Sequence, residues 1–429
     1  MLPYTKPKLF RDPIHDIIAI TPDGDDGRLL LRLVDTREVQ RLRRIRQLGL
    51  TNVVYHGADH SRFAHSMGVA HLAQRMLRQL ARRGVDISAD DRLVTLAAAL
   101  LHDVGHGPFS HVLERFTGAD HEGRSAGLVQ DPDSQVHAAL SDFDPSLPEA
   151  IVGRLTGDDG APQFLHEIVS SQLDADRLDY ILRDGHATGV KIGSFDLQRI
   201  LAMLDVHNNH LAVHEGAREA VEGYLLARFH MYTQVYLHRT SRSAERMLRA
   251  ALERAGALHR DGYAFSWWPG GTMGKLLAGE AIAPAAFADL DDADVWLCFK
   301  NWEREADRVL AEICSGLLYR GLWKTFSLPV GDRESANALV GEARARAAAL
   351  GFDPDYDVLV DESKDSPYQP MTGDPARSRS IRMVDSTGRG FFIEEESEVI
   401  RMFGRLLHQQ RLLCVHPRLR DPLRPLFGP

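Results

Sequence analysis

The residues best suited to carry out chemistry lie in the sequence LLHDVGHGPFSH, at residues 100–111. His102 and Asp103 are adjacent there, and on a helix they place an imidazole and a carboxylate within one turn of an apolar segment. A buried aspartate is rare unless it is paired or bound to a metal ion. Imidazole and carboxylate together suit zinc, iron or manganese, so the pair is a candidate for part of a divalent-metal centre of the kind that hydrolyses phosphoesters.

Two further candidate ligands occur elsewhere in the chain. His65 lies within RFAHSMG, and Asp176 lies within LDADRLDYILRD, where Tyr180 and Asp184 follow at i+4 and i+8 on the same helical face. A lone His-Asp dipeptide is common, and a histidine such as His65 on an amphipathic helix is more often a hydrogen-bonded core residue than a ligand. Only the joint pattern favours a metal site.

The elements that must position these residues are predicted to be mostly helical. Apolar residues recur every three or four positions in residues 61–82 and again in residues 93–104, and Ser88 is placed to cap the second of these helices. The segment 105–108, GHGP, ends that helix. Further helices are predicted at 164–184, 194–205, 216–236 and 239–256.

Strand signals are short and lie outside these helices. Residues 17–22 are predicted to pair with residues 29–33, and residues 210–215 form another short strand. Residues 127–162 are acidic and rich in Pro, Gly and Asp, which predicts an exposed excursion. The segment IRMVDSTGRGFFIEE predicts a hairpin around residues 386–388.

These patterns predict a mostly α protein with two domains. Residues 1–330 would form an all-helical core, in which the metal motifs span about residues 60–185. Residues 331–429 would form a small α+β domain, because a helical stretch there is followed by strand signals.

Composition narrows the class of protein. The 429 residues carry 51 basic and 60 acidic side chains, a formal charge of -9, which makes nucleic acid an unlikely partner because a duplex-binding surface needs a basic face. The three cysteines are too few and too widely spaced for a disulfide framework. No apolar run of membrane-spanning length and no signal-peptide core is present, so we expect a cytoplasmic enzyme without membrane association.

Four motifs together resemble those of the HD-domain dNTP triphosphohydrolases. These motifs are RFAHS at 62–66, HDVGHGPFSH at 102–111, HE at 121–122 and DADRLDY at 174–180. The likeness runs from about Lys8 to about Arg242. It includes bacterial members and the mammalian member that carries a sterile-alpha-motif domain, a domain that is not expected here.

The resemblance implies a reaction and a metal centre. The reaction is hydrolysis of a deoxynucleoside triphosphate to the deoxynucleoside and inorganic triphosphate. The implied ligands of a divalent metal (iron, zinc, manganese or nickel) are His65, His102, Asp103 and Asp176, and a Mg²⁺ ion would accompany the nucleotide. Coordination lowers the pKa of water to about 7, so that such a centre can supply the nucleophile at neutral pH.

The resemblance also assigns catalytic roles. His111 would protonate the departing 5′ oxygen, with Glu114 behind it as the orienting carboxylate, where the family usually has aspartate. Arg62, His106 and His121 would hold the α-phosphate, and Glu122 would be the partner of His121. The alternative is that these histidines lie at helix ends or in loops with only solvent contacts.

Substrate contacts follow from the same likeness. Arg177 would neutralise the β- and γ-phosphates, Tyr180, Asp184 and Gln47 would meet the 3′-hydroxyl, and Leu48 would pack where a 2′-hydroxyl would intrude. The alternative is that Arg177 and Asp184 form ordinary surface ion pairs. Tyr232 and Tyr236 are also candidate substrate contacts, although Tyr232 stands where the mammalian relative has a phosphate-binding arginine and Tyr236 stands where it has a histidine.

A regulatory pocket is also implied. Asp35 and Arg43 match positions that bind an activating guanine nucleotide, and Arg199 and Arg218 match two further arginines of that pocket. Arginines bind phosphate bidentately, so GTP, dGTP or another dNTP is the expected activator, and the chain is expected to form a homotetramer because several subunits build the pocket. The alternative is that RLRRIR is only a solvated basic face.

Two other functions remain open from the sequence. The same metal centre could hydrolyse another phosphoester, such as a nucleoside monophosphate or a cyclic nucleotide. The chain could also be a non-catalytic nucleotide sensor, against which the complete set of candidate ligands and His111 argues.

Overall fold

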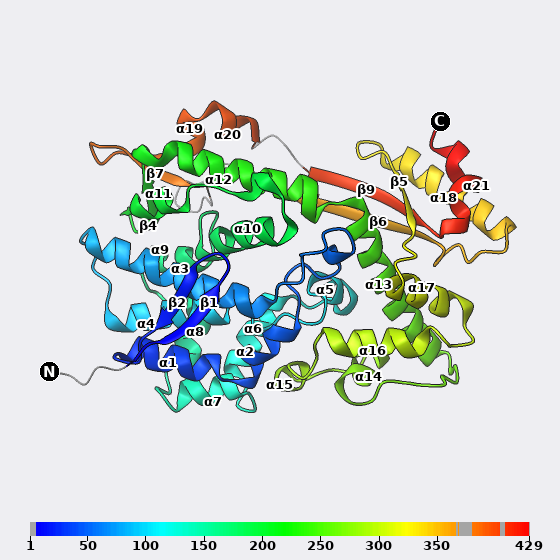
Figure 1. Cartoon of the computed structure of the whole chain (residues 1–429), viewed down its shortest axis with the longest axis horizontal. Coiled ribbons are helices and arrows are strands. Elements are labelled where there is room, and N and C mark those ends of the chain that lie inside the picture. Colours follow the sequence, from blue (N-terminus) through cyan, green and yellow to red (C-terminus); the bar gives the residue numbers. More distant parts are fainter. Residues whose placement is uncertain (1–5, 366–367, 369–379, 404–407, 429) are drawn as a thin grey trace.

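The computed structural model describes residues 6–365, 368, 380–403 and 408–428. Helices make up most of it, as predicted, and form two groups that lie at opposite ends of the molecule (Figure 1). None of the helices in these ranges is both long and apolar enough to span a membrane.

Three helices form the centre of the first group: α3 (Arg62–Arg82), α4 (Ala89–Leu101) and α10 (Ala175–Thr188). Each begins directly after a residue whose side chain caps it, because Ser61, Ser88 and Asp174 accept hydrogen bonds from backbone N–H groups of the first turn. α3 packs against both other helices, and their apolar faces share one core. The predicted helices at 61–82 and 93–104 are therefore confirmed.

The remaining helices of this half are short and pack around these three. They are α1 (Asp25–Val34), α2 (Arg37–Arg41), α5 (His111–Thr117), α6 (His121–Gln130), α7 (Gln135–Ser141), α8 (Leu147–Thr156), α9 (Gln163–Val169), α11 (Leu197–Ala202) and α12 (Arg218–Met231), which continues into a π-helical turn at Tyr232–Tyr236.

The second group packs around the long helix α13 (Arg239–Arg260). The other helices beyond residue 260 are α14 (Gly271–Ala278), α15 (Pro284–Phe287), α16 (Asp292–Trp302), α17 (Arg308–Leu318), α18 (Arg333–Ala349), α19 (Ile393–Glu396), α20 (Glu398–Phe403) and α21 (Arg420–Leu423). α13, α14, α16 and α17 enclose a second core, in which Trp302 and Phe299 are fully buried.

The described strands form three small sheets. β1 (Lys8–Asp12) and β2 (Asp16–Ile20) make an antiparallel hairpin. β3 (Leu204–His207), β4 (His210–His214), β7 (Arg382–Val384) and β8 (Gly390–Phe392) follow one another in a second sheet. β9 (His408–Val415) lies between β5 (Lys324–Ser327) and β6 (Val358–Asp365) in the third. The strands after residue 331 thus join sheets that also contain earlier strands. The hairpin predicted around residues 386–388 is confirmed, because β7 and β8 pair antiparallel.

Two local predictions are wrong. Residues 29–33 lie within helix α1, because Leu29, Leu30 and Leu33 are buried at helical spacing and β2 pairs with the preceding strand instead. Residues 127–162 are not an exposed excursion, since α7 and α8 bury Val136, Leu140 and Ile151 in the first core. Most Pro, Gly and Asp residues of this segment lie at the ends of these short helices or in the short connections between them, and not in one long loop.

One predicted helix is divided. Residues 164–184 form α9 and the first part of α10, with a break near Asp174, whose carboxylate accepts the backbone N–H groups of Ser171 and Arg177. The break places Asp176 in the first turn of α10, where the helix dipole favours a negative charge.

Candidate metal centre and active site

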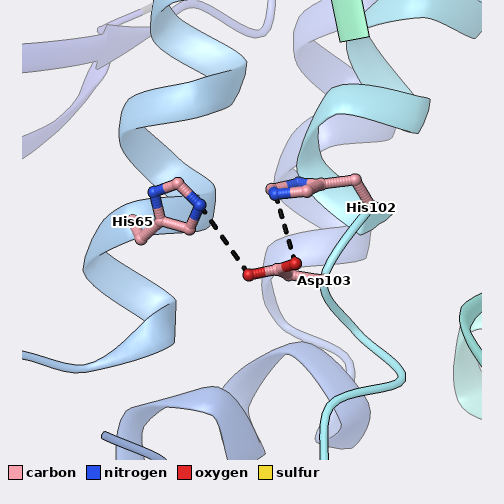
Figure 2. Close-up of side chains that lie close together, drawn as sticks. All are labelled: His65, His102 and Asp103. Atoms are coloured by element: carbon pink, nitrogen blue, oxygen red, sulfur yellow. Dashed lines mark ion pairs between the residues drawn. The ribbon is translucent and has the colours of Figure 1, made fainter. Parts of the chain in front are cut away.

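The four predicted metal ligands meet where α3, α4 and α10 converge. His65 projects from the first turn of α3 toward His102 and Asp103 at the end of α4 (Figure 2). Donor atoms of these three residues all lie within 4.8 Å of one another. Asp176 completes the set, because its Oδ1 lies 3.0 Å from His65 Nε2 and 3.7 Å from His102 Nε2.

These separations fit donor atoms around one divalent ion. Nitrogen and oxygen ligands about 2.0–2.2 Å from a metal lie about 3.0–3.6 Å from each other. Asp103 Oδ1 is 3.4 Å from His102 Nε2, and Asp103 Oδ2 is 3.7 Å from His65 Nε2. His65 Nε2 and His102 Nε2 are enclosed and form no hydrogen bond of proper geometry. The two imidazole nitrogens and the two carboxylates are therefore placed so that they would coordinate one divalent metal ion.

The charge balance of the cluster also favours a cation. Burial alone would lower the pKa of His65, but the Asp176 and Asp179 carboxylates outweigh this effect and raise that pKa to about 10. Burial opposes ionisation of Asp103, yet His102, Arg62 and His106 hold its pKa well below the usual range. The carboxylates thus stay ionised and attract positive charge to the donor atoms.

A buried ion network orients His65. Its Nδ1 lies 2.8 Å from Asp179 Oδ2, and Asp179 also contacts His15 Nε2 at 2.7 Å and Arg183 Nε at 2.8 Å. Arg183 in turn donates to Asp12 at 2.8 Å. A carboxylate on the second nitrogen of a ligand histidine fixes the ring and directs the other nitrogen toward the metal.

Gly68 allows Asp179 to approach α3 this closely. A Cβ atom at residue 68 would lie 1.9 Å from Asp179 Oδ1 and 2.5 Å from Arg183 Nη2. No larger residue fits without displacing the network. The sequence patterns assigned no role to Gly68, Asp179, Arg183, Asp12 or His15, although Asp179 lies within the same DADRLDY motif as Asp176.

Beside the metal centre, three histidines surround one carboxylate. Glu114 Oε2 lies 2.9 Å from His111 Nδ1, and Glu114 Oε1 lies 2.9 Å from His121 Nδ1 and 3.3 Å from His106 Nδ1. Burial would raise the pKa of Glu114, but these three contacts lower it far below its usual range. The alternative that these histidines have only solvent contacts is therefore wrong for His106 and His121. The His111 side chain is 66% exposed, although its Nδ1 contacts Glu114.

His106 links this cluster to the metal centre. Its Nε2 lies 3.2 Å from Asp103 Oδ1, and its ring stacks on His121 at 3.9 Å. Burial, followed by the nearby Arg62 guanidinium, lowers the pKa of His106 to about 4, so the ring is neutral at neutral pH. The stacking requires the backbone of residues 102–111 to contact α6, and Gly105 permits this because a Cβ there would lie 2.3 Å from Ser125 N.

Arg62 and the residues before His111 complete this side of the site. Arg62 is 4% exposed, pairs with Asp103 and donates from Nε to Ser110 Oγ at 2.8 Å. Phe109 and Ser110 both have positive φ values, of 52° and 48°. Consecutive non-glycine residues in this region are strained, and such strain occurs where surrounding structure enforces a functional geometry. Here it sets the direction in which α5 presents His111.

The predicted pairing of Glu122 with His121 is wrong. Glu122 is exposed on α6, and His121 pairs with Glu114 instead. Successive residues of a helix point in directions about 100° apart, so His121 and Glu122 diverge once His121 faces the cluster.

Aromatic residues and Asp184 lie on the other side of the metal centre. The Tyr180 ring is 6.4 Å from the His65 ring and 6.2 Å from the Tyr236 ring, and the Tyr232 ring is 5.1 Å from the Tyr236 ring. The structure thus brings together residues from α10 and from the π-helical turn that follows α12.

Asp184 is buried and held by two partners. Tyr236 Oη donates to Asp184 Oδ2 at 2.8 Å, and His60 Nε2 lies 2.7 Å from Asp184 Oδ1. Gln47 lies nearby, because its backbone N–H donates to His60 O at 2.9 Å. Its enclosed Oε1 has no hydrogen-bond partner among the residues that the structure describes. Leu48 is partly buried against the first core. Asp184 therefore forms no surface ion pair, and His60 is a contact that the sequence patterns missed.

Arg177 is anchored rather than free. It pairs with Asp174 and donates to Ser171 O, while its Nε is enclosed without a partner. Asp174 thus caps α10 and also fixes the direction of the Arg177 side chain.

The four residues of the predicted regulatory pocket have separate partners in this single chain. Asp35 pairs with Lys8 at 3.3 Å. Arg43 stacks over Phe63 with its Cζ 3.5 Å from the ring centre, and Arg199 donates to Gly216 O at 3.0 Å. Arg218 donates to Glu396 Oε2 at 2.5 Å. The described part of one subunit does not join them into one pocket.

Comparison with known proteins agrees with this geometry. Residues 62–178 match the HD domain, and residues 195–262 match the HD associated region. YwfO, a Bacillus subtilis protein described as uncharacterised, is 33% identical over 98% of this chain and 97% of its own length. Chicken deoxynucleoside triphosphate triphosphohydrolase SAMHD1 is 32% identical, and the match covers 58% of this chain but only 45% of that protein.

Solved structures extend the likeness to the whole fold. A phosphohydrolase from Bacteroides thetaiotaomicron has a TM-score of 0.81 and 32% identity, covering 96% of this chain and all of that one. A hypothetical protein from Aquifex aeolicus has a TM-score of 0.73 and 26% identity, covering 98% of this chain and all of that one. Residues 62–178, which match the HD domain, include His65, His102 and Asp103, and relatives that are 32–33% identical cover almost the whole chain. The chain therefore belongs to the HD-domain phosphohydrolase family.

Proposed function

We propose that the protein hydrolyses deoxynucleoside triphosphates to deoxynucleosides and inorganic triphosphate. The observation that carries this proposal is the junction of two clusters: His106 contacts both Asp103 of the metal centre and Glu114 of the histidine cluster. A phosphate oxygen near Arg62 would therefore face the donor atoms on one side and His111 on the other. The SAMHD1 relatives, named as dNTP triphosphohydrolases, support the choice of substrate.

The residues divide the reaction between them. A divalent metal held by the four ligands would polarise the α-phosphate and lower the pKa of water. Arg62 neutralises charge that develops on the α-phosphate, since its guanidinium is buried beside Asp103. His111 Nδ1 is held by Glu114, so Nε2 of its exposed ring is free to give a proton to the departing 5′ oxygen.

His111→Gln tests the proton donor. Glutamine can still form a hydrogen bond but cannot transfer a proton at neutral pH, so kcat should fall by about 10²–10⁴-fold while the metal content stays unchanged. Steady-state kinetics and metal analysis measure both quantities. His166→Gln is the control, because His166 bonds to the Arg154 carbonyl oxygen, away from this cluster. A His111 variant with kcat within about threefold of wild type would assign protonation to another group.

Product analysis tests the proposed reaction itself. The protein, loaded with Mn²⁺ or Fe²⁺ and supplied with Mg²⁺, is incubated with each dNTP, each NTP, a nucleoside monophosphate and a cyclic nucleotide. We expect chromatography to show deoxynucleoside and intact triphosphate from dNTPs. Release of phosphate from the monophosphate or the cyclic nucleotide alone would assign the other phosphoester reaction. Binding without turnover of any of them would assign the sensor function.

We further propose activation by a guanine nucleotide or a dNTP in a homotetramer. Arg43, Arg199 and Arg218 would supply phosphate contacts once subunits meet, because each guanidinium lies at or near the surface of the single chain. Adding GTP or dGTP to a dATP assay should raise the rate and shift the mass measured by light scattering from smaller species to the tetramer. Equal rates and equal masses with and without these nucleotides would rule out this regulation.

A further inference from the structure

One buried carboxylate links the second group of helices to the chain segment that carries His111. Asp292 is the first residue of α16, which belongs to the second group (Figure 1), and it is 5% exposed. Its Oδ1 accepts the backbone N–H of Phe109 at 2.9 Å, and its Oδ2 accepts the backbone N–H of Arg46 at 3.0 Å. Two segments that lie far apart in the sequence are thus held by the same side chain.

Asp292 forms no ion pair with a basic side chain of the described residues. Arg44 pairs with Asp291 instead, and the Arg46 guanidinium lies 3.0 Å from Asp59 Oδ1. Burial raises the pKa of Asp292 to about 6, because the two N–H groups and the charge of Arg46 only partly offset the loss of water. The side chain is therefore ionised at neutral pH, and both of its oxygens can accept hydrogen bonds.

The contact with Phe109 holds the strained turn that precedes His111. Phe109 and Ser110 have φ values of 52° and 48°, and Ser110 gives α5 no side-chain cap. The Phe109 ring also packs against α16, with its centre 5.6 Å from the ring of Trp296, one helical turn beyond Asp292. α16 therefore fixes both the backbone and the ring of Phe109.

The contact with Arg46 anchors the other end of this link. Arg46 forms a β-bridge with Ser61, the cap of α3, and the backbone N–H of Arg62 donates to Ile45 O at 2.9 Å. This segment is thus attached to the start of the helix that carries the first metal ligand. The carboxylate sets the separation between the start of α3 and the turn before His111.

We propose that Asp292 is a positioning residue for His111, an inference that rests on the proposed role of His111 as the proton donor. The carboxylate keeps the turn before α5 at a fixed place relative to α3, so that the His111 ring faces the departing 5′ oxygen. A displacement of about 1 Å in a catalytic group can lower a rate by about 100-fold. Asp292 is enclosed and acts on the reaction only through the chain that carries His111.

Asp292→Asn tests this assignment by separating kcat from KM. Asparagine keeps the size of the side chain and one acceptor oxygen, but its NH₂ group would face one of the two backbone N–H groups. The kcat for dATP should fall by about 10- to 100-fold. The KM should change by less than about threefold and the metal content should stay unchanged, because the variant leaves the metal ligands and the triphosphate contacts in place.

The His111→Gln background separates positioning from a general structural role. If Asp292 acts through His111, adding Asp292→Asn to His111→Gln should change the single-turnover rate by less than about twofold. A merely structural contribution would lower the rate by the same factor in both backgrounds, and that result overturns the proposal.

Asp131→Asn is the matched control. Asp131 also joins two segments through backbone N–H groups, since it accepts that of Asp133 at 3.0 Å and that of Ala285 at 2.9 Å. It lies at the end of α6 opposite to His121. The control may lose as much Tm as Asp292→Asn, but its kcat should stay within about twofold of wild type. A loss of kcat as large as that of Asp292→Asn would show general loosening of the fold and would overturn the assignment.

The outcomes for Asp292 and for the overall reaction are distinguishable. A kcat of Asp292→Asn within about twofold of wild type overturns the role of Asp292 even if dNTPs yield triphosphate. If wild type hydrolyses a nucleoside monophosphate and no dNTP, the proposed reaction fails, and the same variants are compared on that substrate, whose 5′ oxygen also needs a proton. If no phosphoester is turned over, His111 donates no proton and both proposals fail.

A second variant covers a failure of Asp292→Asn to fold. Asp292→Glu keeps the charge and both acceptor oxygens, and it should fold with a kcat between those of wild type and Asp292→Asn. Thermal unfolding and the same kinetic assays measure this. Loss of folding in both variants shows that Asp292 is required for the fold as a whole and overturns the positioning role.

Discussion

Replacing Asp103 by asparagine is expected to remove the metal and to lower phosphohydrolase activity by at least about 10³-fold. Asp103 contacts more residues of the site than a metal ligand alone requires: its carboxylate contacts His65, His102 and His106 and pairs with Arg62. Asparagine has nearly the same shape, but its neutral amide is a weaker ligand for a hard divalent cation. The variant should therefore fold with an intact cluster that no longer holds the ion.

The charge of Asp103 matters beyond ligation. Arg62 is almost fully buried, so without the carboxylate its guanidinium becomes an uncompensated positive charge beside the donor atoms. This charge would repel a metal ion and lower the metal affinity further. Phosphoester hydrolysis should then not be restored by excess Mn²⁺ at concentrations that saturate the wild-type protein.

Metal analysis by mass spectrometry and dNTP hydrolysis measure the two effects. Asp357→Asn is the control, because Asp357 is also a buried aspartate, paired with Arg308 at 2.8 Å just before β6, and should affect stability without affecting metal content. An Asp103→Asn protein that keeps stoichiometric metal and wild-type kcat would show that the centre described here is not catalytic.

Arg183→Met is expected to destabilise the fold by about 3–5 kcal/mol, the cost of breaking a buried ion network from one side. Arg183 is 1% exposed and donates to both Asp12 and Asp179. Methionine fills most of the volume but leaves these two buried carboxylates without their shared cation. Because Asp179 also orients His65, metal affinity should fall by about 10- to 100-fold as well.

The pH dependence of this loss has a definite sign. In the native protein burial opposes ionisation of Asp179, but Arg183 and two histidines hold the pKa of this carboxyl well below the usual range. The ionised Asp179 therefore stabilises the fold at neutral pH, and this stabilisation is lost in acid. In the variant, burial without Arg183 raises the pKa of the carboxyl in the folded state. Protonation then relieves the penalty, and the stability deficit should shrink as the pH falls from 7 toward 5.

Urea unfolding of the metal-free proteins at pH 7 and pH 5 measures the deficit. Arg83→Met is the control, since the Arg83 side chain is 35% exposed, pairs with Asp205 at 2.6 Å and should contribute less than about 1 kcal/mol. A deficit for Arg183→Met no larger than that of the control, or one that grows as the pH falls, would contradict this account of the network.

The sequence alone determined the parts of the site that lie within single helices. The periodicity of residues 61–82 and 93–104 placed His65 and His102 on helices, and the structure brings both to one point with Asp103 and Asp176. Helical spacing is a local property, so a pattern of apolar residues is enough to define it. Residues 29–33 show the limit of such patterns, since a short apolar run fits either a strand or a helix.

Only the tertiary structure decided which partner each side chain has. Glu114 rather than Glu122 pairs with His121, and Asp179, to which the sequence patterns assigned no role, fills the space beside Gly68. Burial and pairing depend on which distant segments pack together, and spacing along the sequence carries no such information.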